Sequence, residues 1–189
     1  MDEQWTHDKA LDLLCQHVTN ENLVKHCLAS EAIMRALAAR FGEDPDRWGL
    51  AGLLHDLDFE QTKDTPSDHG NQTAEILGRE GVPDDVIQAI REHNAEELVG
   101  VERQSRMGIA LSAAETVTGL IVATALVMPD RRLASVKPSS VKKRMKKKDF
   151  ARNVSRDRIH ECERIALKLD EFLALSVEAM QGIAEPLGL

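Results

Sequence analysis

The sequence predicts an all-α protein that folds as a single domain. Residues that favour helices dominate its 189 positions, whereas only 3% are aromatic and tyrosine is absent. Apolar residues recur at helical spacing, and capping residues, glycine or proline separate these segments. No repeat, low-complexity segment or long linker divides the chain. We therefore expect one helical domain over residues 1–189, with a functional core at about 21–128 and a C-terminal basic segment and helix at 137–189.

Capping and stop signals place the first two helices. We expect a helix over residues 5–17 and a second over about 20–41. Thr19 or Asn20 can cap the second helix, because their short polar side chains accept hydrogen bonds from free backbone N–H groups. Gly42 provides its stop, since glycine readily adopts the left-handed conformation that ends helices.

The third expected helix carries the most informative stretch. Asp44 followed by Pro45 predicts its start, and an apolar run leads from there into the neighbours His55 and Asp56. Buried ionisable groups are costly unless they are paired or coordinated. An imidazole beside a carboxylate in a segment fit for burial is therefore typical of a metal site.

Two shorter helices are expected next, and each carries a histidine. A polar loop over residues 60–66 precedes a helix that Ser67 caps and that contains His69. Pro83 begins the following helix, which ends near His93.

The C-terminal half contains two long expected helices. The first, over about residues 103–127, is long enough to span a bilayer, but it is rich in small residues and carries Glu115 near its centre. Because a carboxylate is costly in lipid, a helix buried in a soluble core is the better interpretation, and we expect no membrane partner. A final amphipathic helix is expected over 155–180.

Six side chains, spread over five expected helices, are candidate metal ligands: His26, His55, Asp56, His69, His93 and Glu115. Nitrogen and carboxylate ligands without thiolate suit one or two divalent ions of Mn, Fe, Co, Ni, Zn or Mg. Each histidine alone has an ordinary structural explanation, so the ordered set carries the argument. Glu115 has no charged partner on its own helix, and a buried ion pair with Arg91 or His26 is an equally good explanation for it.

Charge and cysteine content narrow the other classes. The net charge of −8 argues against a general nucleic-acid binder. Lys142–Lys148 nevertheless form a basic cluster, which we interpret as in large part a solvated helical face, with a rim contact to the phosphate pocket or an RNA-facing surface as the functional alternative. Cys15, Cys27 and Cys162 are odd in number and widely spaced, which is typical of reduced thiols. The first five residues lack the features of a signal peptide, so we expect a cytoplasmic protein.

The order of the candidate ligands resembles the HD-domain superfamily of metal-dependent phosphohydrolases, specifically its small HDIG-type members. The matching pieces are His26, the run LLHDLDFE ending at Glu60, His69-Gly70, REHN at Arg91–Asn94, and SAAETVTGLI ending at Ile121. The similarity continues through SVKKRMKKKDFA and NVSRDRI to the C-terminal Leu-Gly-Leu. At the position of the family's last aspartate, this chain has the longer Glu115.

The resemblance implies a helical bundle with a divalent metal centre. His26, His55, Asp56 and the acid at position 115 would form its core, whereas His69 and His93 would bind a second metal or contact phosphate.

The implied reaction is hydrolysis of a phosphate ester, of a nucleotide or another small phosphorylated metabolite, by metal-activated water. Asp56 is the central catalytic candidate. Asp58 would act as a general base, fix a histidine, or be only a solvent-facing loop carboxylate. Lys63 and Arg91 are the candidate substrate contacts. The alternative is a catalytically weak or inactive binding module with the same fold, and the oligomeric state stays open.

Overall fold

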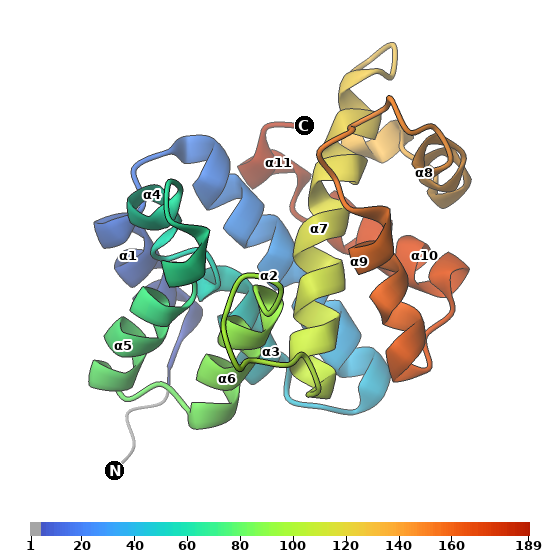
Figure 1. Cartoon of the computed structure of the whole chain (residues 1–189). Helices are drawn as coiled ribbons and strands as arrows, with labels where there is room; N and C mark the ends of the chain where they lie inside the picture. Colours follow the sequence, from blue (N-terminus) through green and yellow to red (C-terminus); the bar gives the residue numbers. More distant parts are fainter. Residues whose placement is uncertain (1–4) are drawn as a thin grey trace.

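The computed structural model describes residues 5–189, so the first four residues, on which part of the signal-peptide argument rests, lie outside the described residues. Within residues 5–189 the secondary structure is helical and contains no strand, which confirms the all-α prediction (Figure 1). The helices are α1 (His7–His17), α2 (Glu21–Phe41), α3 (Pro45–Leu54), α4 (Phe59–Thr62), α5 (Asn71–Arg79), α6 (Asp84–His93), α7 (Arg106–Leu126), α8 (Pro138–Met145), α9 (Arg156–His160), α10 (Leu169–Gln181) and α11 (Ala184–Leu187). Three short 3-10 helices, η1 (Pro66–Asp68), η2 (Leu133–Ser135) and η3 (Glu161–Ile165), complete the fold.

The long helices α2 and α7 form the centre of the bundle, and α3 packs against both. In the view of Figure 1, α1, α4 and α5 lie on one side of α7, and α8, α9 and α10 lie on the other. One cluster of buried apolar side chains includes residues from α1 through to α11. The predicted caps of α2 and α3 are confirmed: Asn20 and Asp44 accept backbone N–H groups, and Gly42 is left-handed.

The apolar composition of α7 is explained by its packing inside the fold. Within the described residues it is the one helix that is long and apolar enough to cross a membrane, but most of its most apolar stretch is buried inside the fold. Helices α2, α6 and α9 cover it, together with η3.

A glycine sets the distance between α2 and α3. A Cβ atom added at Gly52 would lie 2.8 Å from Glu31 Cα and 2.8 Å from the Ser30 carbonyl carbon, and these backbone atoms cannot move aside. We expect Gly52→Ala to lower the free energy of unfolding by about 1–3 kcal/mol, because overpacking forces the two helices apart. The control is Gly78→Ala, where nothing lies within 4 Å and a gain of up to about 1 kcal/mol is expected. Equal effects in denaturant unfolding would contradict this contact.

The expected loop and helix start around His69 are wrong in detail. The predicted loop overlaps α4, Ser67 lies in η1, and α5 begins only at Asn71, so His69 precedes the helix. Gly70 permits this arrangement because it holds a φ of 88°. The Asp58 carboxylate accepts the backbone N–H groups of Gly70 and Thr73 and so replaces a local cap.

The expected continuous helix over 155–180 is also wrong. The chain forms α9 and η3, turns at Ala166 with a φ of 60°, and then begins α10. Ala166 is exposed, whereas the following Leu167 is 1% exposed. The turn therefore places the larger apolar side chain of Leu167 in the core and leaves the smaller Ala166 at the surface. Burial of Leu167 therefore accompanies the break in helical periodicity.

Candidate metal centre

The predicted ligands meet in one hollow of about 500 Å³. His26 comes from α2, His55 and Asp56 follow α3, and Glu115 comes from α7. His69 lies just before α5, and His93 is the last residue of α6. The lining side chains of the hollow include His26, Asp56, His69, His93 and Glu115, while His55 lies beneath them with 1% exposure.

Asp56 lies at the centre of the cluster and serves two groups of potential ligands. One group is His26, His55 and Asp56, and the other is Asp56, His69 and His93. Its Oδ1 atom lies 3.4 Å from His55 Nε2, 3.3 Å from His69 Nε2 and 3.8 Å from His93 Nε2. Its Oδ2 atom lies 3.6 Å from His26 Nε2. Both groups therefore share one carboxylate.

The backbone fixes the orientation of two of the histidine rings. His55 Nδ1 lies 2.9 Å from the carbonyl oxygen of Gly52, and His93 Nδ1 contacts the carbonyl oxygen of Ile90. A carbonyl oxygen only accepts hydrogen bonds, so each Nδ1 carries the proton. In the neutral rings, each Nε2 atom then offers a lone pair to the centre.

Side chains orient the other two rings in the same sense. His69 Nδ1 lies 2.7 Å from Asp58 Oδ1, an acceptor. His26 Nδ1 lies 2.9 Å from Thr118 Oγ1, whose own hydroxyl donates to the Glu115 carbonyl oxygen. Both contacts place the proton on Nδ1, so the Nε2 atoms of His26 and His69 also point their lone pairs inward.

The centre therefore gathers acceptors without matching donors. His26 and His55 approach at 3.1 Å between their Nε2 atoms, and His69 and His93 do so at 3.0 Å. Such pairs repel unless a proton or a cation lies between them. Ligands of one cation at about 2.0–2.1 Å are themselves separated by about 2.9–3.4 Å, which is close to these distances. The donor set fits one or two divalent cations.

Titration behaviour follows from the same arrangement. Burial disfavours the Asp56 carboxylate, but the charges of His55 and its other histidine neighbours outweigh it and lower the pKa of Asp56. Burial also disfavours a charged His69, but hydrogen bonds to Asp56 and Asp58 and their charges raise its pKa to about 9. Burial is the main cause that lowers the pKa of His55 and of His93. In the absence of a cation, His69 holds the compensating proton.

Asp58 is a buried positioning residue. Its side chain is 1% exposed, so the expectation of a solvent-facing loop carboxylate is wrong. Oδ2 accepts the N–H groups of Gly70 and Thr73, both at 2.8 Å, and Oδ1 accepts from His69. Because both oxygens already have donors, the geometry favours the alternative in which Asp58 fixes a histidine.

Glu115 divides its two oxygens between an ion pair and the centre. Oε2 lies 3.9 Å from His26 Nε2, while Oε1 lies 2.9 Å from an Arg158 guanidinium nitrogen. Of the two partners expected for a buried ion pair, His26 lies within ion-pair distance and Arg91 does not, while the closer partner, Arg158, was not expected. Arg158, from α9, also donates to Ser112 Oγ and to the carbonyl oxygen of His93. It lines the hollow and contacts residues next to both ligand groups.

We expect Arg158→Ala to weaken metal binding by about 10-fold or more, because it releases Glu115 and the His93 backbone from their common partner. Metal titration monitored by calorimetry measures this effect. Arg158→Lys keeps the charge without the planar fork and should bind metal with intermediate affinity. Arg152→Ala, at an exposed arginine of the same segment, is the control. Equal affinity in all three variants would exclude a supporting role for Arg158.

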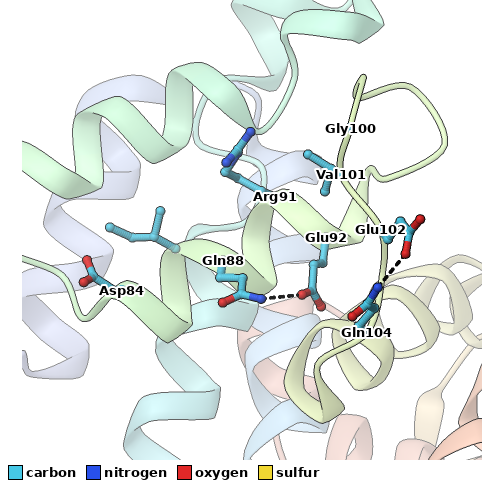
Figure 2. Close-up of a pocket in the computed structure, with 9 residues that line it drawn as sticks. Asp84, Gln88, Arg91, Glu92, Gly100, Val101, Glu102 and Gln104 are labelled. Atoms are coloured by element: carbon cyan, nitrogen blue, oxygen red, sulfur yellow. Dashed lines mark hydrogen bonds between the residues drawn. The ribbon is translucent and has the colours of Figure 1, made fainter.

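The structure separates the two predicted substrate contacts. Lys63 lines the hollow beside the ligands. Arg91 instead lines a second hollow of about 570 Å³ between α6 and the segment around Gly100–Gln104 (Figure 2). Its Nε donates a hydrogen bond to Asn71 Oδ1. Arg91 is therefore placed outside the lining of the metal centre.

Comparison with known proteins agrees with this geometry. A model of the HD domain matches residues 23–120, which hold all six candidate ligands. Ribonuclease Y of Oleidesulfovibrio alaskensis is 27% identical over 100 residues, covering 53% of this chain and 18% of that protein. The tRNA (cytidine(56)-2'-O)-methyltransferase of Thermoplasma volcanium is 29% identical over 131 residues, covering 65% and 37%. No solved structure matches the chain significantly.

The chain thus spans less than two fifths of the length of these curated relatives, so what they share is a region and not a whole protein. The family match, by contrast, covers more than half of the chain. It contains the neighbours His55 and Asp56, around which three further imidazoles gather. The chain belongs to the HD-domain superfamily of metal-dependent phosphohydrolases.

Proposed function

We propose that the protein hydrolyses a phosphate ester of a nucleotide or another small phosphorylated metabolite. The observation that carries the proposal is the shared carboxylate: Asp56 stands between two pairs of imidazoles whose lone pairs converge on it. A divalent cation held there would polarise a phosphoryl oxygen and lower the pKa of water. The hollow of about 500 Å³ lies in the size range of small-molecule sites.

The chain's own residues would bind and orient the substrate. Lys63 and Arg158 bring positive charge to a hollow that otherwise contains carboxylates, and both can contact phosphate oxygens. The side chain of Arg158, from α9, is 26% exposed and lines the hollow. Cys27, a buried thiol near Asp56, is a poor nucleophile, because burial and the Asp56 charge raise its pKa well above the usual value.

The test is hydrolysis of generic phosphate esters with and without Mn²⁺. We expect purified protein to release nitrophenol from p-nitrophenyl phosphate or bis-p-nitrophenyl phosphate, with loss of activity in EDTA and recovery on adding Mn²⁺. His55→Ala serves as the matched inactive variant. Release by His55→Ala at the wild-type rate would assign the activity to a contaminant and contradict the proposal.

The second candidate is a binding module that keeps the fold without turnover. Glu115 favours this candidate, because one of its oxygens pairs with Arg158 and the other lies 3.9 Å from His26 Nε2. This candidate predicts bound metal and nucleotide binding without product. Metal content together with absence of hydrolysis over a panel of nucleoside monophosphates, cyclic nucleotides and dinucleotides would favour it over the enzyme.

A further inference from the structure

A basic cleft lies between α8 and α9, apart from the metal centre. It has a volume of about 770 Å³. Its charged and polar lining consists of Lys142, Lys146, Lys148, Arg152, Arg156, Asp157 and His160. Met145, Val154 and Leu169 supply its apolar part. In Figure 1, α8 and α9 lie on the same side of α7.

The cleft belongs to a segment whose charge opposes that of the whole chain. Residues 137–160 contain ten of the 24 lysines and arginines but only two of the 32 aspartates and glutamates. The protein is therefore strongly acidic outside this segment. Positive charge concentrated along one concave surface attracts polyanions to that surface, whereas the acidic remainder of the protein repels them.

Some of these cations stabilise the fold, and others are available. Lys142 pairs with Asp170, and Arg144 stacks on Phe150. In contrast, Lys146, Lys148 and Arg152 are exposed and form no ion pair or hydrogen bond through their side chains within residues 5–189. The expectation of a solvated helical face is incomplete, because α8 ends at Met145 and the last three lysines follow it.

The cleft wall is built by Arg156. Its guanidinium donates to the carbonyl oxygens of Met145, Lys147, Phe150, Ala151 and Val154. The Arg156 side chain therefore holds together the backbone of residues 145–154, which carry Lys146, Lys148 and Arg152. Charge-assisted hydrogen bonds of this kind hold a loop in one shape, so the three cations are presented together.

We propose that this cleft binds a single-stranded nucleic acid through its phosphates. Three unpaired cations on a surface larger than one phosphate suit a chain of regularly spaced negative charges. Among residues 5–189, no Phe, Tyr or Trp lines the cleft, and His160 is its one aromatic ring, so phosphate contacts outweigh base stacking and binding should depend little on sequence. A membrane surface fits less well, because the cations line a concave cleft and its apolar residues lie among them instead of protruding.

Helix α9 separates this cleft from the metal centre. Arg156, Asp157 and His160 line the cleft, whereas Arg158 on the same helix lines the metal-binding hollow. A strand held in the cleft would therefore lie one helix away from Asp56. Binding at the cleft needs no metal and no hydrolysis, so the inference is independent of the proposed function.

The test is fluorescence anisotropy with a labelled 20-nucleotide oligouridine in EDTA, at several salt concentrations. We expect wild-type protein to bind and K146A/K148A/R152A to bind at least 10-fold more weakly. Each phosphate contact on a single strand contributes about 0.7 to the slope of log K against log salt, so three lost contacts should reduce the slope by about 2. His55→Ala should bind like wild type.

A charge-matched control separates the cleft from net charge. R79A/R131A/R132A removes three exposed arginines that do not line the cleft and should retain wild-type affinity. Equal loss in both triple variants, or no binding by wild type at 50 mM salt, would overturn the proposal. Binding to anionic phosphatidylglycerol vesicles in preference to the oligouridine would also overturn it. Oligothymidine of the same length distinguishes RNA selectivity from recognition of any phosphodiester strand.

Discussion

Asp56→Ala is expected to remove metal from both ligand groups and to abolish hydrolysis. The reason is geometric: Asp56 Oδ1 faces His55, His69 and His93, and Oδ2 faces His26, so no other residue belongs to both groups. Metal catalysis supplies several kcal/mol of transition-state stabilisation, and each 1.36 kcal/mol is tenfold in rate. We therefore expect a loss of about 1,000-fold or more, together with metal content near zero by mass spectrometry.

Single-histidine variants are the matched controls for Asp56→Ala. His26→Ala damages only the first group and His69→Ala only the second, so each should retain metal at the undamaged group. Circular dichroism should show wild-type helical content for all three, since none of these side chains belongs to the apolar core cluster. Full metal content in Asp56→Ala would mean that the two imidazole pairs bind cations without the shared carboxylate.

Local signals in the sequence predicted most of the helices and most of the candidate ligands. Asn20, Gly42 and Asp44-Pro45 act through their immediate neighbours, so the ends of α2 and the start of α3 followed from the residues alone. His55 and Asp56 were predicted by their contrast with the apolar run before them. These predictions required no knowledge of which helices pack together.

Interactions between distant segments could not be read in the same way. The start of α5 depends on Asp58, more than ten positions earlier, and sequence rules for caps consider only adjacent residues. The partner of Glu115 is Arg158, 43 positions later, in a segment whose helix breaks at Ala166. The one available signal was the unpaired acid itself, which required a cation but did not identify it.

Asp58→Asn is expected to weaken metal binding at His69 and His93 by about 10- to 100-fold with little change in fold. The asparagine oxygen can still accept the N–H groups of Gly70 and Thr73, which places its NH₂ group against His69 Nδ1. A donor there forces the proton of His69 from Nδ1 to Nε2. The Nε2 lone pair needed for a metal is then lost. Nitrogen-15 NMR of labelled histidine should report the changed tautomer.

The same substitution decides between the two roles considered for Asp58. A general base could be replaced by asparagine with loss of turnover but with normal metal content at both groups. A positioning residue predicts loss of metal from the second group only, with His26 and His55 unaffected. Asp58→Ala adds a stability measurement: it leaves two buried N–H groups without an acceptor, at about 1–3 kcal/mol each. Asp58 contacts both His69 and the start of α5. Asp58→Ala should therefore weaken the start of α5 and lower metal affinity, whereas Asp58→Asn should lower metal affinity alone.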